Sequence, residues 1–471
     1  MKVIQISFPL LAALLLPLAV SASDGVQVRT DHESMAREIF KDVIAMDTSV
    51  TKKETPKMAS YLAARFSHAG FDAADVIEVP TGPDMMSLMV RYRGKDSDSQ
   101  GIGFLAHMDV VTAFRKDWEL EPFKLTERDG YFIGRGTADN KAGIVGLTAT
   151  FIKLKREGYV PRRDLVLLFT ADEESGMVSA RHFATELKDE INIEYAINAD
   201  ALSGVLMPNG AVFGYYVQGA EKSYRSIRLT VRNPGGHSSA PRPDNAIYQL
   251  AKALIRIENF QFPVMINDIS AGMLRSAAAR SDPETASAID KLIRNPGDPA
   301  AADIVSANPM LSTVIRTTCV ATMLEAGHAE NALPQSASAV VNCRIMPGVQ
   351  PEEVYAALRT EIGDEGVEMN ALQESTIAPA SPMREDIMAA IGSAIEEYAD
   401  VELFPFMASY GTDGKEFRAK GTPVYGSSGT FMDPLEAYAH GLNEKIPVQT
   451  FYASLGYWER LMKQLADTPA P

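Results

Sequence analysis

The sequence predicts an α/β protein with a three-layer α/β core and a second, α+β domain inserted into it. Three observations favour this fold class. Short apolar runs alternate with segments of helical periodicity over the first two hundred residues. From about Ser223 the runs become half-exposed and alternating, and from about Ala378 the first pattern returns. The chain has 471 residues, which is long for a single core.

The N-terminus has the pattern of an export signal. A single basic residue, Lys2, precedes an apolar stretch over residues 4–20, which Pro9 and Pro17 interrupt. This stretch is short for a membrane span, and small residues follow it. We therefore interpret residues 1–22 as a signal peptide, and we expect an exported protein, periplasmic or secreted, whose mature form is not held in a membrane.

Residues 23–222 are predicted to form the first part of the α/β domain. Helices are expected at 28–70, at 143–157 and around Phe183, and strands at 87–92, 101–106, 165–169 and 195–199. The strand segments are short and continuously apolar, as expected of strands that are buried on both faces. Several of them end in polar side chains, at the edge where sheets of this kind bind ligands.

Residues 223–377 are predicted to form the inserted domain. Strands are expected at 225–232, 312–324, 337–345 and 367–372, and helices at 245–260 and from Pro351. The stretch from Met265 to Pro309 is polar and rich in proline, and we interpret it as an insertion within this domain. A predicted helix at 384–398 then opens residues 378–471, the second part of the α/β domain.

Composition narrows the classes of partner and of metal site. The net charge of −16 argues against nucleic acid or an anionic membrane as a partner. The two cysteines, Cys319 and Cys343, lie in strand-like runs that could pair, so a disulfide and two buried thiols are both compatible with the pattern. Two cysteines cannot form a thiolate zinc site, so a metal here must be held by histidine and carboxylate.

Candidate metal ligands follow the predicted strands. His107 and Asp109 are two residues apart, so an extended backbone places them on one face, where the carboxylate can orient the imidazole. The further candidate ligands are Asp139, Glu174, Asp200 and His440. Two histidines, two terminal carboxylates and one bridging carboxylate can hold two zinc ions roughly 3.5–4 Å apart that share a water. Glu173 precedes Glu174, and a carboxylate beside that water is a natural general base.

A set of motifs runs in order along nearly the whole chain. They are His107-Met-Asp-Val-Val, Trp118 with Pro122-Phe123, Gly134-Arg-Gly-Thr-Ala-Asp139, Asp172-Glu-Glu-Ser-Gly176, Gly235-Gly-His-Ser-Ser-Ala-Pro241, Asn331-Ala-Leu-Pro334, Cys343-Arg344 and His440-Gly-Leu-Asn-Glu444. In these motifs the sequence resembles the dinuclear zinc hydrolases that include aminoacylase, glutamate carboxypeptidase and succinyl-diaminopimelate desuccinylase. It is most similar to their secreted or vacuolar carboxypeptidase branch.

The resemblance implies a zinc-exopeptidase-like catalytic domain with an inserted lid domain of the type through which relatives dimerise. It implies two zinc ions per chain, which cobalt or manganese could replace. One ion would be bound by His107, Asp139 and Asp200, and the other by Asp139, Glu174 and His440, with Asp139 bridging. The resemblance also implies a cis peptide bond between Asp139 and Asn140.

The resemblance also implies catalytic and substrate-binding roles. Asp109 would orient the imidazole beside it, and Glu173 would activate the bridging water and then protonate the leaving amine. His237, from the inserted domain, would stabilise the oxyanion, and in dimeric relatives this histidine comes from the other subunit. Asn331 and Arg344 would bind the substrate carboxylate, a role that suits the planar guanidinium.

These residues predict a zinc-dependent metallohydrolase that cleaves an amide bond next to a free carboxylate in small peptides, as a carboxypeptidase or dipeptidase. An N-acyl-amino-acid amidohydrolase is the alternative, because it cleaves the same bond by the same chemistry. A non-catalytic metal-binding homologue would require the loss of a ligand or of the base, and none is lost. The expected partners are the small peptide or N-acyl-amino-acid substrate and, through the inserted domain, a second copy of the chain.

Overall fold

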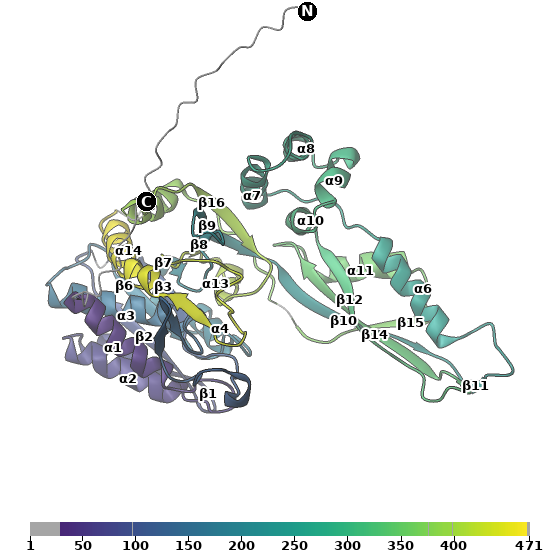
Figure 1. Ribbon diagram of the computed structural model, residues 1–471, viewed down its shortest axis with the longest axis horizontal. Helices are drawn as coiled ribbons and strands as arrows, with labels where there is room; N and C mark the ends of the chain where they lie inside the picture. The colour runs from purple at the N-terminus through teal and green to yellow at the C-terminus, as the bar shows by residue number, and fades with distance from the viewer. Residues whose placement is uncertain (1–28, 97, 375, 398, 469–471) are drawn as a thin grey trace, which may run out of the picture.

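The computed structural model describes residues 29–96, 98–374, 376–397 and 399–468, so the predicted signal peptide lies outside the described residues. Figure 1 shows a larger part, built around a sheet with helices on both faces, and a smaller, elongated part that projects from it. The larger part has the predicted three-layer α/β/α arrangement.

The sheet of the larger part is mixed. Its strands are β1 (Val76–Gly82), β2 (Met85–Tyr92), β3 (Gly101–His107), β6 (Leu165–Thr170), β7 (Ile193–Asn198), β8 (Gly204–Leu206), β9 (Val212–Glu221), β16 (Leu403–Ala408), β17 (Val424–Gly426) and β18 (Phe431–Met432). Their order is β1-β2-β6-β3-β7-β17-β9-β8-β18, with β16 beside β9. The neighbours β6, β3 and β7 are parallel, so their carboxyl ends meet at one edge of the sheet.

Helices cover both faces of this sheet. One face packs against α1 (Asp31–Ile44), α2 (Thr55–His68), α3 (Lys141–Arg156), α12 (Glu385–Glu396) and α14 (Val448–Asp467), and the other against α4 (Val178–Ala184), α5 (Lys188–Ile191) and α13 (Gly414–Ala419). Because strand side chains alternate, Phe104 joins the first core and Leu105 the second. The apolar periodicity that predicted helix over 28–70 corresponds to α1 and α2, with a break between them.

Small elements complete the larger part. These are the three-stranded sheet of β4 (Thr126–Arg128), β5 (Tyr131–Ile133) and β19 (Lys445–Pro447), and the short 3-10 helices η1 (Ala73–Asp75) and η2 (Arg115–Asp117). Strand β19 follows the loop that carries His440 and pairs with β5. This pairing holds the C-terminal end of that loop against the first half of the chain.

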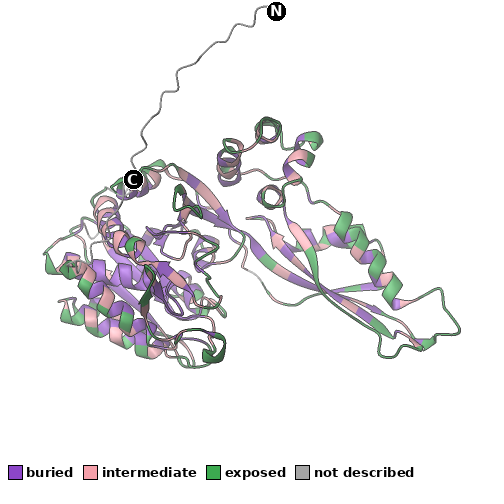
Figure 2. Ribbon diagram, viewed as in Figure 1, coloured by how far each residue is buried: buried purple, intermediate pink, exposed green. Residues whose placement is uncertain are grey.

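The smaller part is an antiparallel sheet with helices on one face. Its strands lie in the order β12 (Thr318–Ala326), β14 (Ser336–Ile345), β10 (Ser223–Arg232) and β15 (Val367–Ala371), and α6 (Ala246–Asn259) and α11 (Pro351–Ile362) cover them. A two-stranded ribbon, β11 (Gly236–His237) with β13 (Ala332–Leu333), forms the tip farthest from the larger part (Figure 1). Figure 2 shows that the outer side of α6 is exposed.

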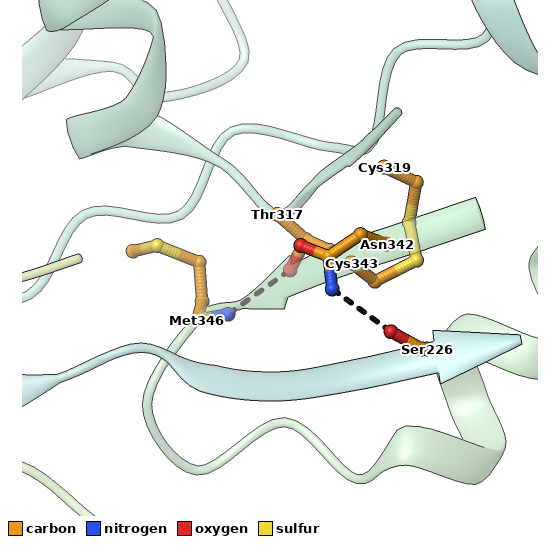
Figure 3. Close-up of a disulfide and its surroundings, with 6 residues drawn as sticks. All are labelled: Ser226, Thr317, Cys319, Asn342, Cys343 and Met346. Atoms are coloured by element: carbon orange, nitrogen blue, oxygen red, sulfur yellow. Dashed lines mark hydrogen bonds between the residues drawn. A yellow bond between two sulfur atoms is a disulfide. The ribbon is translucent and has the colours of Figure 1, made fainter. Parts of the chain in front are cut away.

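The two cysteines form a disulfide, which settles the question that the sequence left open. Cys319 in β12 lies directly opposite Cys343 in β14, and the bond joins the two strands (Figure 3). Beside it, the Asn342 side chain donates a hydrogen bond to the Ser226 hydroxyl of β10 at 3.1 Å. The disulfide therefore reinforces the outer strand of the smaller sheet.

The stretch from Met265 to Pro309 is helical, which the sequence pattern did not predict. It contains α7 (Asp268–Ala278), α8 (Pro283–Arg294), α9 (Pro299–Ser306) and the start of α10 (Pro309–Ile315), and these helices share a small apolar core. Three of its four prolines, Pro283, Pro299 and Pro309, occupy first helical turns, where a missing N–H costs nothing, and Pro296 lies in the turn between α8 and α9. The strand predicted at 312–324 begins only at Thr318, because residues 312–315 complete α10.

The two parts meet at a nearly continuous strand. Only Lys222 separates β9, in the larger sheet, from β10, in the smaller one, and its buried ammonium donates a hydrogen bond to the Arg316 carbonyl at 2.7 Å. Helix α7 packs on β16 at the same place, and Ile269, Met346 and Met407 form a buried cluster there. Among the described residues, no helix is long and apolar enough to cross a membrane.

Candidate active site

The predicted metal ligands gather at the carboxyl edge of the parallel strands. His107 is the last residue of β3, Asp200 lies two residues beyond the end of β7, and the loop after β6 carries Glu174. Asp139 comes from the loop that precedes α3, and the Asp139–Asn140 peptide bond is cis, as the resemblance implied. His440 comes from the C-terminal part of the chain, so five distant segments contribute one side chain each.

The Asp139 carboxylate lies between the two imidazoles. Its Oδ1 is 2.9 Å from His107 Nε2, and its Oδ2 is 3.1 Å from His440 Nε2. Glu174 Oε1 is 2.8 Å from His440 Nε2, and Asp200 Oδ2 is 4.0 Å from His107 Nε2. One oxygen of Asp139 is thus directed at each half of the set, as a bridging carboxylate requires.

The chemistry of these donors fits a pair of metal ions. His107 Nδ1 is 3.0 Å from the carbonyl oxygen of Asp109, which leaves Nε2 for a metal. Hydrogen bonding to the carboxylates of Asp139 and Glu174 raises the pKa of His440 to about 10. Burial lowers the pKa of His107, but the neighbouring carboxylates outweigh it and the net shift is upward. Without a metal, the imidazoles therefore hold protons that a bound cation would displace.

Asp109 has a second contact that the sequence did not predict. Its carboxylate lies 3.5 Å from His107 Nδ1, where the prediction placed it. The same carboxylate accepts hydrogen bonds from the backbone N–H groups of Glu173 and Glu174, at 3.1 and 3.0 Å. Asp109 thus fixes the loop that carries the predicted base and a predicted ligand, as well as the imidazole.

Glu173 belongs to the wall of the cavity beside the ligands. It lines this cavity with Asp139, Asp200 and His440. Burial raises the pKa of Glu173 well above the usual value, and the carboxylates of Asp200 and Glu174 add to the shift. A more basic carboxylate accepts a proton more readily, which suits a group that transfers protons.

A buried ion pair ties the two ligand loops together, and its role was not predicted. Glu444 is fully buried and pairs with Arg135, and its carboxylate accepts hydrogen bonds from the N–H groups of Ala138 and Asp139 at 2.7 and 3.0 Å. Arg135 also donates to the carbonyl oxygen of Gly441 at 3.0 Å. Glu444 stood in a recognised motif, but sequence spacing could not show which backbone groups it would bind.

The residues predicted to bind substrate lie at opposite ends of the smaller part in the folded chain. His237 is exposed on the tip ribbon, and the N–H of Ser238 donates to the Asn331 carbonyl there at 3.1 Å. Arg344 lies at the other end of β14 and donates a hydrogen bond to the Ser409 carbonyl of the larger part at 2.9 Å. Arg344 thus contacts the larger part, which carries the metal ligands, whereas the β11–β13 ribbon that holds His237 beside Asn331 forms the far tip (Figure 1).

Comparisons with known proteins agree with this geometry. The model of "Peptidase family M20/M25/M40" matches residues 103–464. The human N-fatty-acyl-amino acid synthase/hydrolase PM20D1 is 29% identical over 81% of this chain and 77% of its own. A probable carboxypeptidase S-like 2 of Dictyostelium discoideum is 25% identical over 80% and 74%.

A solved structure shares the fold. The M20 family metallo-carboxypeptidase Sso-CP2 from Sulfolobus solfataricus superposes with a TM-score of 0.69, at 16% identity, over 93% of this chain and 100% of that one. The family model covers most of the chain and includes all five predicted metal ligands. The chain therefore belongs to peptidase family M20/M25/M40 and is a metallohydrolase of C–N bonds.

Proposed function

We propose that this protein is a dinuclear zinc amidohydrolase that releases an amino acid with a free carboxylate from its peptidyl or N-acyl derivative. The observation that supports the proposal most directly is the Asp139 carboxylate, with one oxygen directed at each imidazole and Glu173 facing the adjacent cavity. A carboxypeptidase or dipeptidase and an N-acyl-amino-acid hydrolase share this chemistry. The names of the relatives include both activities.

In this proposal the protein side chains bind, orient and move protons. Two zinc ions would polarise the scissile carbonyl and acidify the attacking water, and the residues that would hold them are His107, Asp139, Glu174, Asp200 and His440. Glu173 takes a proton from that water as the water oxygen bonds to the carbonyl carbon. Glu173 then gives the proton to the amide nitrogen as the C–N bond breaks, so a carboxylic acid and an amino acid leave.

Arg344 is the proposed partner of the substrate carboxylate. Its guanidinium stacks over Tyr224, 4.8 Å from the ring centroid, and contacts the loop of Ser409, next to Tyr410 and Gly411 of the cavity wall. A planar guanidinium held in this way can bind a carboxylate through two parallel hydrogen bonds. An amide in place of the carboxylate would lose the ion pair.

We also propose that a second copy of the chain supplies His237 and Asn331. Paired positions place Ser336 opposite Arg232 and Arg344 opposite Tyr224, so the tip lies roughly 27 Å along the strands from Arg344. Strand β12 is an edge strand that exposes Val320, Met323 and Leu324, each by more than half. An exposed apolar edge of this kind favours pairing with another chain.

Metal content and a substrate panel test the proposed function. We expect about two zinc ions per chain after purification without chelator. We expect hydrolysis of dipeptides or N-acyl amino acids, loss of turnover after chelation, and recovery with zinc. The same substrates with an amidated C-terminus should not be cleaved. Full activity with one ion or none, or equal turnover of free and amidated substrates, would contradict the proposal.

Export, predicted from residues 1–22, remains a separate proposal, tested by the location of the mature protein.

A further inference from the structure

One polar side chain in the wall of the cavity has no role in the proposed hydrolysis so far. Tyr410 lines this cavity of about 360 Å³ together with Asp139, Glu173 and Asp200. The residue follows β16 in the larger part, so it belongs to the same chain as the metal ligands. It is 40% exposed, which leaves it open to a bound substrate. A phenol at this place lies beside the reacting groups.

The loop that carries Tyr410 is held on both sides of the residue. The carbonyl oxygen of Ser409 accepts a hydrogen bond from Arg344 at 2.9 Å. On the other side, the N–H and the hydroxyl of Thr412 donate to the buried carboxylate of Glu221 at 2.6 and 2.7 Å. These contacts fix the backbone of Tyr410 before a substrate arrives, as catalysis by a preorganised donor requires.

The surroundings of the phenol favour its protonated form. A tyrosine hydroxyl has a pKa of about 10 in water, so it is an O–H donor at neutral pH. Burial raises the pKa of Tyr410 further, and the carboxylates of Asp200 and Asp139 add to the shift. A hydrogen bond with the backbone of Leu202 acts in the opposite direction and does not outweigh them. The hydroxyl is therefore a neutral donor whose neighbours include two predicted metal ligands.

A substrate that binds both Arg344 and the metals passes Tyr410. Ser409, which contacts Arg344, precedes Tyr410 directly, and the carboxylates of Asp139 and Asp200 act on the phenol. In the proposed function the substrate carboxylate meets Arg344, and the scissile carbonyl meets the metals. The reacting amide then lies beside the phenol.

We propose that Tyr410 is a further catalytic residue, whose hydroxyl donates a hydrogen bond to the oxygen of the scissile carbonyl as this oxygen gains negative charge. This inference rests on the proposed amide hydrolysis. The phenol keeps its proton throughout, because Glu173 carries the proton from the water to the amide nitrogen. The hydrogen bond strengthens as charge develops, so it stabilises the transition state more than the bound substrate. Unlike the donor proposed for His237, this one comes from the chain that carries the metal ligands.

The loss of a single hydroxyl group provides the test. Zinc-loaded wild type and Tyr410→Phe are assayed with alanyl-phenylalanine and N-acetyl-phenylalanine, one substrate of each proposed kind. We expect kcat to fall by roughly 10²–10³-fold, the range for loss of one oxyanion donor, with KM and zinc content close to the wild type. Tyr425→Phe is the matched control, because its lost hydroxyl donates to the Pro382 carbonyl at 2.6 Å, outside the cavity lining. Its kcat should stay close to the wild type.

A tetrahedral inhibitor distinguishes an oxyanion donor from a side chain that only shapes the cavity. The phosphinate analogue of alanyl-phenylalanine has a phosphinate and a methylene in place of the scissile amide, so its oxygens mimic the oxyanion. Its inhibition constant should rise in Tyr410→Phe by about the factor by which kcat/KM falls. Inhibition by free phenylalanine, which is a product, should not change.

The outcomes separate the role of Tyr410 from the proposed function. A fall in kcat that is matched by weaker phosphinate binding supports the donor role. Wild-type kcat in Tyr410→Phe, loss of zinc from this variant, or a lower kcat with unchanged phosphinate inhibition overturns that role and leaves the amide hydrolysis intact. If the wild type cleaves neither substrate nor any other dipeptide or N-acyl amino acid, the proposed function fails, and the role of Tyr410 with it.

Discussion

The neighbours Glu173 and Glu174 differ in what their side chains face. Glu174 contacts His440, whereas Glu173 lines the cavity, and the carboxylate of Asp109 holds the backbone of both. Adjacent residues of the same type can thus have different roles, because the loop turns their side chains in different directions. Single substitutions separate a base from a ligand here.

We expect Glu173→Gln to retain metal and to lower kcat by roughly 10²–10⁴-fold, the range for loss of general acid–base catalysis. Glu174→Gln should lower metal content as well, because His440 and the metal lose an anionic donor. Elemental analysis and steady-state kinetics on the two variants, purified side by side, measure both effects. Zinc release from Glu173→Gln together with zinc retention by Glu174→Gln would mean that the roles are reversed.

Glu444 contacts the backbone of a ligand loop and is not itself a predicted metal ligand. His440 has a φ of +63°, which is uncommon for a residue other than glycine, and the buried Arg135–Glu444 pair holds the loops of His440 and Asp139 together. We expect Glu444→Gln to weaken zinc binding by roughly 10–100-fold. An amide nitrogen would then face backbone N–H groups whose hydrogen bonds the carboxylate now accepts, and the ligand loop would lose those bonds.

A zinc titration against a competing chelator measures this affinity. Glu436→Gln is the matched control, because Glu436 is exposed and pairs on the surface with Lys445, the residue after Glu444. Equal zinc affinity in Glu444→Gln and the wild type would show that the buried pair does not position the ligands.

At the scale of elements, the disulfide between β12 and β14 is the clearest target. It closes a loop with a sequence separation of 24 residues, for which chain entropy gives about 3 kcal/mol. We expect the free energy of unfolding of the Cys319→Ala/Cys343→Ala double variant to be lower by about that amount, so that it unfolds at a lower denaturant concentration. The wild type should lose stability in reductant, and the double variant should not respond to it. A wild type insensitive to reductant would show that the bond is not formed in solution.

The elements that sequence patterns predicted are those whose signal is local. The continuous apolar runs became β3, β6 and β7, and the spacing of Met35, Ile39 and Val43 became the buried face of α1. Helices α7–α10 were missed because the stretch is polar and its prolines were interpreted as breakers. Pro283 instead follows the N-cap Asp282, whose side chain accepts two backbone hydrogen bonds. A proline at the start of a helix and one in a loop differ only in such capping contacts.

The candidate ligands were predictable for a different reason. His107, Asp139, Glu174 and His440 each stand in a motif, Asp200 follows a predicted strand, and the structure brings the five together. The hydrogen bonds of Asp109 to the Glu173 loop and of Glu444 to Ala138 depend on backbone groups, which have no signature in the sequence. The separation of Asn331 from Arg344 also required the strand register.

At the scale of the whole molecule, the exposed position of His237 at the tip is the reason for proposing that a complete active site needs two chains. If the partner supplies this histidine, Glu173→Gln and His237→Ala remove groups from different halves of one site. Each variant alone should have strongly reduced kcat, by roughly 10²–10³-fold for His237→Ala with unchanged zinc content. Dimers that contain one chain of each variant retain one intact site.

Co-expression of the two variants should therefore restore activity to about a quarter of the wild type, since random pairing leaves one site in four intact. Sedimentation would establish the dimer, and separate tags would isolate the mixed species. If mixed dimers stay inactive, His237 acts within its own chain, and wild-type kcat in His237→Ala would exclude it from catalysis altogether.

At Lys222 the strand passes from β9 into β10, so a bend there would swing the smaller part as a lever about this pivot. Strand β10 alone spans ten residues, roughly 33 Å, and His237 lies beyond its end. A rotation of about 10° at Lys222 would thus move the tip by roughly 6 Å. Arg344 lies close to the pivot and would hardly move. The same small rotation would thus leave the Arg344 contact in place while it moves His237 and Asn331 together, so the angle between the two parts would set where these two side chains meet a partner's site.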